Sequence, residues 1–312
     1  TAVGANSLNK NTTGADNTAV GKCALACNTT AADNTAVGYN SLCTNTTGCR
    51  NTAIGTSALK ANTTGYDNTA VGRCALRINT TGENNVAIGK DAMICNTVGY
   101  CNTAIGFGSL RCNTIGDLNV GVGSCSFQEN TEGNRNVGIG FRASSCNTTG
   151  ECNTNVGYSA GLTISTGDNN VSLGYDAQTT SATVSHEITL GNGANNNLRC
   201  ADTSISSLSD LRDKTNVEDI PHGLDYILAI RPVKFDWQAR DGTRVGKKDY
   251  GFIAQELDQV EETFGNREYT RLVHKNNPEQ WETDPMKTYP ILIKAIQELK
   301  AENDSLKTRI EA

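Results

Sequence analysis

Residues 62–78 read N-T-T-G-Y-D-N-T-A-V-G-R-C-A-L-R-I, and this 17-residue unit recurs along the first two thirds of the chain. A repeat of this length predicts a stack of small units that each pack only against their neighbours. The second glycine of the unit keeps its spacing at twelve positions without a slip: Gly4, Gly21, Gly38, Gly55, Gly72, Gly89, Gly106, Gly123, Gly140, Gly157, Gly174 and Gly191.

Other positions of the unit keep the same period. Asparagine forms one column from Asn11 to Asn147 and a second from Asn17 to Asn170. A branched aliphatic residue precedes each phased glycine, and a leucine or a similar residue follows it by four positions in most copies, as Val71 and Leu76 do around Gly72. Stacking would turn the asparagines into amide ladders and the Val and Leu columns into a continuous thin core, while glycine supplies the positive φ of the corners.

The unit favours β structure. Its Thr, Asn and Gly content opposes helix, and 17 residues are too few for two packed helices. The runs Asn-Thr-Ala-Val and Ala-Leu, separated by glycine and by an Asn-Thr-Thr-Gly turn, predict two short extended segments per unit. We therefore expect residues 1–200 to form a parallel β-solenoid or β-roll.

The Ala-Val-Gly and Ala-Leu pattern is similar to the head repeats of trimeric adhesins, which are β-rolls built side by side on a threefold axis. Those repeats are shorter than 17 residues, so only the general architecture carries over. The similarity implies a trimeric shaft, in which lateral burial would add to the small apolar area of each chain.

The composition changes near residue 200. All five prolines and both tryptophans follow it, and the net charges before and after it are about −1 and −5. The acidic balance, without a basic stripe, argues against a nucleic-acid partner, and no apolar run reaches the length of a membrane span. The chain begins in mid-repeat at Thr1, so we expect a piece of something longer.

The cysteines and the asparagines of the repeats each allow two interpretations. Three cysteine pairs flank the turn at a spacing of six, where disulfides are possible, but cysteine also substitutes well for a small, half-buried residue. No C-x-x-C pair supports a metal site. The recurrent Asn-Thr-Thr matches a glycosylation acceptor, yet a fixed column also suits hydrogen bonds of a turn. The cysteine pairs are Cys43 with Cys49, Cys95 with Cys101, and Cys146 with Cys152.

The second part, residues 201–312, predicts a small α+β domain. Apolar spacing indicates helices at about 221–230 and 251–260, with a strand at 233–237 between them. Carboxylate pairs such as Glu261-Glu262 look like a solvated face. A closing helix, about 287–312, has an apolar seam in steps of four and three, which favours a self-associating coiled coil over a lone amphipathic helix. The seam residues are Leu292, Ile296, Leu299, Asn303, Leu306 and Ile310.

Three ordered motifs in this part carry a resemblance. S-D-L-R-D-K at 209–214, G-F-I-A-Q-E at 251–256 and the terminal seam resemble the intramolecular chaperone domain that ends phage endosialidase tailspikes and other viral fibres and lies inside the myelin regulatory factor. The resemblance covers residues 204–312. It implies a homotrimer that guides folding of a β-rich stalk and then cuts itself off, without a cofactor.

The resemblance also implies the residues that make the cut. Ser209 would be the nucleophile and Lys214 its general base, and the bond between Leu208 and Ser209 would break. The lysine must be neutral to act, which burial or a cationic neighbour such as Arg212 would favour, whereas Asp210 and Asp213 would oppose it.

A structural interpretation of the same residues remains open. Ser209-Asp210 is also a good helix N-cap, and on a regular helix a residue five positions later points about 140° away. The pair can then meet only if the segment is irregular or if another part of the trimer completes the site, which would withhold cleavage until assembly.

Other sites have little support. His186, His222 and His274 lack partners at ligand or triad spacing, and no phosphate-binding glycine motif occurs. The sequence therefore predicts a trimeric fibre or tailspike segment in a virion, assembled in the host cytoplasm, whose shaft is structural or binds a host glycan or protein. Two rivals remain: an adhesin with an uncleaved trimer clamp that binds through exposed Thr and Asn columns, and an ice-binding solenoid with flat Thr rows.

Overall fold

A computed structural model describes residues 1–195, 209–238, 245–265, 267–275 and 281–311. The chain separates into two compact units, Thr1–Asn192 and Gly193–Ala312. The sequence predicted a fibre shaft at residues 1–200 and a self-processing domain at residues 201–312; these two roles stay predictions.

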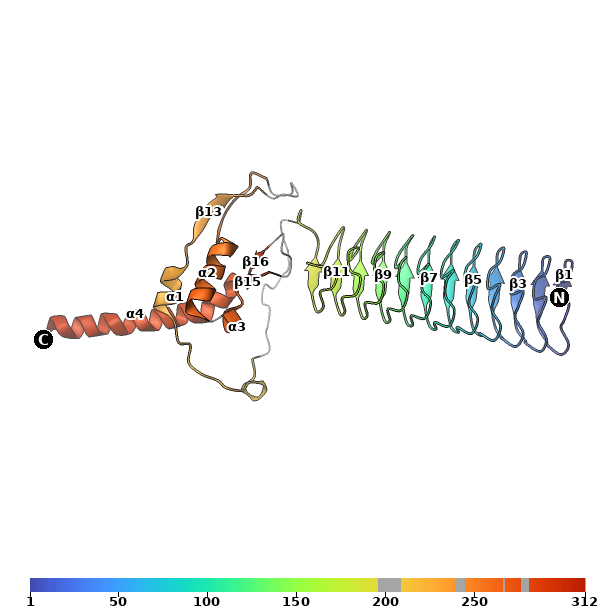
Figure 1. Ribbon diagram of the computed structural model, residues 1–312, viewed down its shortest axis with the longest axis horizontal. Coiled ribbons are helices and arrows are strands. Elements are labelled where there is room, and N and C mark those ends of the chain that lie inside the picture. Colours follow the sequence, from blue (N-terminus) through green and yellow to red (C-terminus); the bar gives the residue numbers. More distant parts are fainter. Residues whose placement is uncertain (196–208, 239–244, 266, 276–280, 312) are drawn as a thin grey trace. The chain divides into compact units, whose positions relative to one another are not determined.

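The first unit is the expected parallel β-solenoid, drawn as a row of stacked coils in Figure 1. Each 17-residue coil contributes one short strand, and each strand pairs in parallel with the strands of the coils before and after it. Register is kept, so that Thr52 lies beside Thr69 and Ala53 beside Ala70. The strands are β1 (Ala2–Val3), β2 (Thr18–Val20), β3 (Thr35–Val37), β4 (Thr52–Ile54), β5 (Thr69–Val71), β6 (Val86–Ile88), β7 (Thr103–Ile105), β8 (Val120–Val122), β9 (Val137–Ile139), β10 (Thr154–Val156), β11 (Val171–Leu173) and β12 (Ile188–Leu190).

The phased glycine is required at the corner for two reasons. Gly72 has φ +136°, which residues with side chains rarely adopt, and a Cβ there would lie 2.5 Å from the carbonyl oxygen of Gly89 in the next coil. The Ala-Leu run that follows is a turn and not the second extended segment that the sequence predicted. Leu76 has φ +50°, which bends the chain and turns its side chain into the coil.

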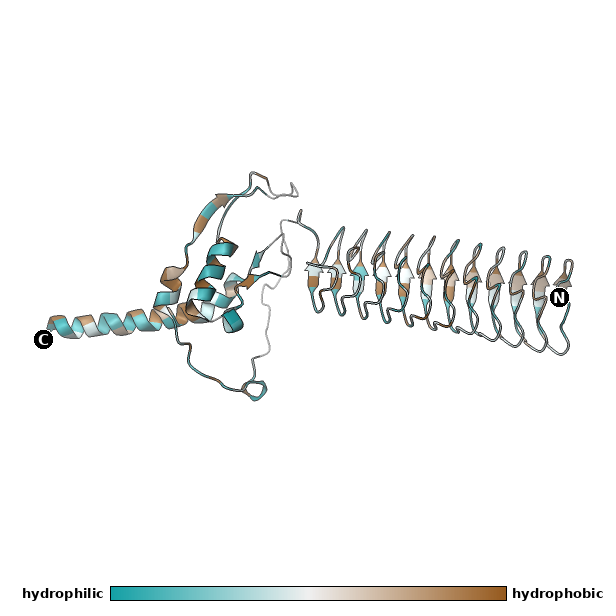
Figure 2. Ribbon diagram, viewed as in Figure 1, coloured by the Kyte–Doolittle hydropathy of each residue, from teal (hydrophilic) through white to brown (hydrophobic). Residues whose placement is uncertain are grey.

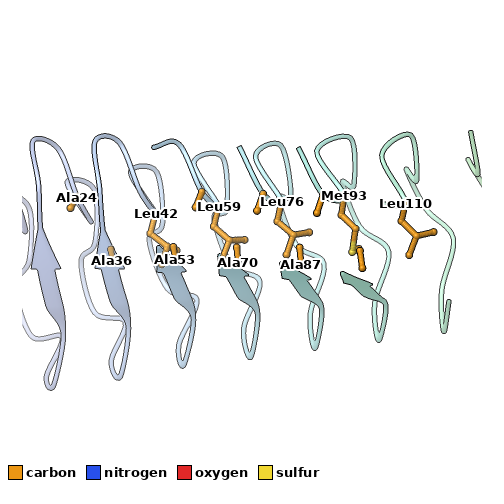
Figure 3. Packing of buried hydrophobic residues seen from close by; sticks show 14 of the residues in the cluster. Ala24, Ala36, Leu42, Ala53, Leu59, Ala70, Leu76, Ala87, Met93 and Leu110 are labelled. Atoms are coloured by element: carbon orange, nitrogen blue, oxygen red, sulfur yellow. The ribbon is translucent and has the colours of Figure 1, made fainter. Parts of the chain in front are cut away.

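The core is narrower than expected, because one of its two predicted columns faces outward. The Leu column is fully buried from Leu25 to Phe127 and packs against a column of alanines such as Ala70 and Ala87 (Figure 3). The Val and Ile residues before the glycines do not join it; Ile54 is 41% exposed. Successive side chains of a strand point to opposite faces, and here the middle residue is the buried one, so the residues on either side of it face outward and the prediction of a Val core was wrong.

Both asparagine columns form the predicted ladders. Asn62 Nδ2 donates to Asn45 Oδ1 of the previous coil at 2.8 Å and to Gly65 O at 2.8 Å. In the second column the backbone N–H of Asn68 donates to Asn51 Oδ1 at 3.0 Å. These bonds satisfy polar groups inside a coil that has little room for apolar side chains.

The second unit packs three helical segments around a small core. Tyr226, Leu257, Leu272 and Ile291 form that core, which brings together α1, α2 and α4. The elements are α1 (Leu224–Ala229), β13 (Val233–Asp236), β14 (Lys248–Gly251), α2 (Ala254–Phe264), α3 (Arg267–Thr270), β15 (Val273–His274), β16 (Glu282–Thr283) and α4 (Thr288–Glu311), with 3-10 turns at Leu211–Asp213 and Pro285–Lys287.

The second helix begins later than the sequence predicted, because Gly251 is the last residue of β14 and pairs with Val233 across an antiparallel hairpin. It ends at Gly265, which has φ +66° and caps the helix in the left-handed conformation. The first helix also begins late, at Leu224, where the backbone N–H donates to the carboxylate of Glu298 on α4 at 2.7 Å.

The closing helix divides into two faces. On one face, Ile291 and Ala295 are buried in the core of the unit. The predicted coiled-coil seam lies mostly in solvent: Leu292 is half-buried, and the exposed residues are Ile296, Leu299, Asn303, Leu306 and Ile310. Figure 2 shows hydrophobic residues recurring along α4 between hydrophilic ones. In the parts of the chain that the structure describes, no helix is both long and apolar enough to span a membrane.

Candidate active site

Ser209 and Lys214 lie in direct contact. Lys214 Nζ is 2.7 Å from Ser209 Oγ and 3.3 Å from the carbonyl oxygen of the same serine. The segment between them is a single 3-10 turn, Leu211–Asp213, after which Lys214 returns to an extended conformation with φ −121° and ψ 142°. Because the helix stops after three residues, the lysine side chain can fold back over the turn, which a continuous helix would prevent.

Asp210 and not Ser209 caps this turn. The Asp210 carboxylate accepts the backbone N–H of Arg212 at 2.9 Å. The Ser209 hydroxyl is therefore not needed as the cap and is held by Lys214 instead. Asp210 fixes the backbone that brings the pair together.

Arg212 does not lie over the lysine as a free cation. Its guanidinium donates to both oxygens of Asp210, with Nη2–Oδ2 at 2.5 Å and Nε–Oδ1 at 3.0 Å. These hydrogen bonds from Arg212 lower the pKa of the Asp210 carboxyl. The Asp210 carboxylate therefore balances the charge of Arg212. This weakens the expectation that Arg212 would help to keep Lys214 neutral.

The whole segment 209–214 is exposed to solvent in the single chain. Leu208, the other side of the predicted cleavage point, lies outside the described residues. The described residues of the single chain hold the Ser209 hydroxyl and the Lys214 amine in contact, and both side chains are exposed.

The histidines form no catalytic arrangement in the described residues. His222 Nδ1 lies 3.0 Å from Asp225 on the surface and its ring packs edge-on against Phe264. His186 lies at a corner of the solenoid with φ +66°, and His274 is exposed in β15.

The cysteines of the shaft are free thiols, most of them half-buried. The three pairs spaced by six are not joined; Cys49 instead accepts the backbone N–H of Ala32 at 3.4 Å. Burial raises the pKa of the Cys112 thiol, with a further contribution from Cys95 in the same column one coil away. Among the described residues no group of three His, Cys, Asp or Glu side chains could hold a metal ion.

The asparagines of the Asn-Thr-Thr runs are unsuited to glycosylation or to receptor binding in the folded shaft. From Asn28 onward their side chains are fully buried, and the amide nitrogen that would accept a glycan donates to the ladder and the turn. The prediction that an adhesin could use exposed Asn columns was therefore wrong. The threonine that follows each of these asparagines also bonds within the shaft, since Thr63 Oγ1 donates to Thr80 O at 3.0 Å.

A buried carboxylate was missed. The sequence predicts a solvated Glu261, but the structure buries it fully, and it accepts hydrogen bonds from the hydroxyl of Thr270 at 2.5 Å and the backbone N–H of Leu272 at 2.7 Å. Its position four residues after Leu257, on the apolar face of α2, was the available signal. It ties α2 to the start of β15 and has no contact with Ser209 that would give it a catalytic role.

Residues 209–266 match a peptidase family model that is described as the chaperone of endosialidase. The match begins at Ser209, includes Lys214 and ends just after α2, so the segment that follows the solenoid is similar to this family. The search of curated proteins and the search of solved structures gave no match.

Proposed function

We propose that this chain is part of a viral or phage tail fibre or tailspike, in which the C-terminal unit drives trimerisation and folding of the solenoid and then cleaves itself off between Leu208 and Ser209. The observation that carries the proposal is the 2.7 Å contact between Lys214 Nζ and Ser209 Oγ at the first residues of the family match. The reaction occurs once per chain.

The chemistry needs only the two side chains and water. Ser209 Oγ attacks the carbonyl carbon of Leu208 while Lys214 Nζ takes the hydroxyl proton. The C–N bond then breaks, the proton passes to the departing nitrogen of Ser209, and an ester joins Leu208 to Ser209 Oγ. Hydrolysis of the ester leaves a carboxylate on Leu208 and a free amino group and hydroxyl on Ser209.

Assembly is the proposed trigger. The lysine donates to the serine in the single chain, whereas catalysis requires a neutral amine that accepts a proton. Excluding water from the exposed pair would favour the neutral amine. Cover from neighbouring subunits would couple cleavage to completion of the trimer.

Two uncovered surfaces support a homotrimer. The exposed seam of α4 has the spacing of a coiled coil, with Asn303 at one position to set the register. On the solenoid, the outward positions of β2 to β12 are all Thr, Val, Ile or Leu, a charge-free strip that continues from coil to coil. Its aliphatic row is exposed at Ile54, Ile88 and Ile105, and parallel copies would present the same row to one another in successive coils.

The proposed setting is a virion fibre that is assembled in the host cytoplasm. The shaft would then serve as a spacer or bind a host glycan or protein. No nucleic-acid partner, cofactor or membrane insertion is part of the proposal.

The test compares freshly expressed full-length wild type with Ser209→Ala, Lys214→Ala and Lys214→Arg by denaturing gel electrophoresis and intact mass. Wild type should give pieces that end at Leu208 and begin at Ser209, and all three variants should stay whole. Lys214→Arg is the matched control, because it keeps a cation that can donate to Ser209 but cannot lose its proton.

The alternative is a trimeric adhesin fibre that keeps its C-terminal unit as a permanent clamp. The exposure of residues 209–214 favours it, because an uncovered lysine next to serine is not by itself an active base. Whole wild-type chains in a trimer of the expected native mass would support the clamp and exclude cleavage. Ice binding would be recognised by thermal hysteresis. The first threonine of each Asn-Thr-Thr run bonds within the shaft, as Thr63 and Thr80 do, so this row is not available to bind ice.

A further inference from the structure

The interior of the solenoid changes from apolar to polar towards its C-terminal end. The position held by leucine, methionine or phenylalanine from Leu25 to Phe127 is taken by Ser144 and then Gly161. The facing position, alanine or glycine in the earlier coils, becomes Asn155 and then Ser172, both fully buried. We call residues 137–177 the polar-cored segment.

The polar groups of this interior are incompletely paired. Asn155 Nδ2 donates to Ser144 Oγ at 2.6 Å, but Asn155 Oδ1 and Ser172 Oγ are buried without a hydrogen-bond partner. Gly161 leaves the room that Asn155 occupies, since a Cβ at Gly161 would lie 2.3 Å from Asn155 Oδ1. A buried polar atom without a partner loses its hydration and gains nothing in return.

One asparagine ladder also stops in this segment. Asn147 continues it by donating to Asn130 Oδ1 at 2.8 Å, but the next coil has Ile164 in place of asparagine. Ile164 is almost fully buried and has no side-chain donor, so Asn147 Oδ1 is left without a partner. Within residues 1–195, all of which the structure describes, the buried side-chain atoms left unpaired are these three in coils at 147–172.

The second ladder remains intact through the segment. The backbone N–H of Asn170 donates to Asn153 Oδ1 at 2.9 Å, and the backbone N–H of Glu187 donates to Asn170 Oδ1 at 3.0 Å. The Glu187 carboxylate then closes the column by accepting the hydroxyl of Thr180 at 2.6 Å. The segment thus keeps the hydrogen bonds that hold it once it is stacked but lacks the apolar contacts that would drive the stacking.

We infer that the polar-cored segment is the part of the shaft whose folding depends on the C-terminal unit, whereas the apolar-cored coils at 18–122 stack without that help. The inference rests on the proposed chaperone function and names its client within the chain. An array of coils propagates by nearest-neighbour contacts, so coils with unpaired interior atoms and no leucine column form a barrier to propagation. In the chain they are followed by the coil of β12 and then by the C-terminal unit, so they lie near the end of the shaft where an assembled trimer could hold their strands in register.

The first experiment measures hydrogen exchange by mass spectrometry on the folded wild-type shaft, obtained by expressing the full chain. Amides of 137–177 should exchange about tenfold faster than those of 52–105, because one unpaired buried group changes an opening equilibrium by about that factor. Equal or slower exchange in 137–177 would overturn the inference without any variant.

The second experiment disables the C-terminal unit in the full chain. Leu272→Asp places a charge in the core of that unit, where Leu272 is fully buried, and Leu228→Asp is the matched control at a residue that is 75% exposed. In Leu272→Asp the segment 137–177 should lose protection while 52–105 keeps it, and Leu228→Asp should behave as wild type. Loss of protection in both segments together would overturn the inference but leave a chaperone role, whereas no loss in either would contradict the chaperone role as well.

A repaired interior provides the converse test. Ser144→Leu, Asn155→Ala, Gly161→Leu and Ser172→Ala copy the Leu76 and Ala87 columns, and Ile164→Asn restores the donor to Asn147 Oδ1. Leucines of that column have φ near that of Gly161, +60°, so the backbone accepts the change. Added to Leu272→Asp, the repair should return 137–177 to the protection of 52–105; continued rapid exchange would mean that the interior is not the cause.

Discussion

Lys214 Nζ lies 2.7 Å from Ser209 Oγ although five positions separate the two residues in the chain, because a single 3-10 turn capped by Asp210 reverses the chain between them. The contact is local and forms within one chain. What one chain lacks is the removal of water, since both residues are exposed. The contact between the two side chains and the loss of water that the proposed reaction requires can therefore be tested by separate variants.

Asp210→Ala should slow the proposed cleavage several-fold while it leaves Ser209 and Lys214 unchanged. The substitution removes the acceptor of the Arg212 N–H at 2.9 Å and the partner of the Arg212 guanidinium, so the turn that brings Lys214 to Ser209 loosens. The rate is read from a time course on denaturing gels. Asp213→Ala, which removes a carboxylate of the same turn but not its cap, is the control; equal slowing by both would assign the effect to charge and not to the cap.

Leu299→Ser combined with Leu306→Ser should leave the C-terminal unit folded and abolish the proposed trimer. Both side chains are exposed seam residues beyond the part of α4 that packs on the unit through Ile291 and Ala295. Native mass spectrometry measures the assembly and circular dichroism the helix content. Glu302→Ala, off the seam, should keep the trimer, and a trimer that survives the double substitution would show that α4 does not hold it together.

Gly72→Ala should destabilise the shaft by about 2 kcal/mol or more, because its φ of +136° disfavours a side chain and its Cβ would strike Gly89 O. Gly108→Asn is the control, since φ there is +60° and the nearest atom to a Cβ is 3.9 Å away. It should change stability by less than about 0.5 kcal/mol. Denaturant unfolding measures both, and similar losses would refute the corner argument.

Arg50→Gln should weaken the contact between two neighbouring coils at neutral pH and have no effect in acid. Arg50 donates to both carboxylate oxygens of Asp67, at 2.7 and 2.9 Å, and this hydrogen bonding lowers the pKa of Asp67. A lowered carboxyl pKa stabilises the fold above the ordinary value, and the gain disappears as the pH falls through the lowered one. Local hydrogen exchange at residues 50–67, followed from pH 7 downward through the acid range after correction for intrinsic rates, measures the difference; a loss that does not shrink as the pH falls would exclude the ion pair.

The repeat made much of the shaft predictable. A 17-residue period with glycine and asparagine columns implies stacking, and stacking alone implies the ladders that Asn45 and Asn62 form. The direction in which the strand side chains point was harder to predict, because a valine before glycine looks like a core residue until the inward-facing residue of the strand is known. The unpaired Asn155 Oδ1 could not be foreseen, since it depends on which side chains face it across the coil.

The pairing of Ser209 with Lys214 was suggested by motif and resemblance, not by spacing, because a regular helix would have separated them. Glu261 shows the reverse case, a charged residue whose burial only its neighbours Thr270 and Leu272 explain. The contact between Ser209 and Lys214 depends on where a short helical turn ends, and the burial of Glu261 depends on the residues that pack beside α2.

The sequence by itself determined that this chain stacks β coils, where its corners lie, and that a segment resembling the chaperone of endosialidase begins near Ser209, since these follow from period, glycine and motif. Only the tertiary structure decided that the valine column faces outward, that Asp210 caps the turn so that Lys214 reaches Ser209, and that residues 147–172 leave buried atoms unpaired. The period shows which residues occupy equivalent positions. The direction of each side chain and its hydrogen-bond partners depend on φ, ψ and the volume of neighbours that lie far apart in the chain.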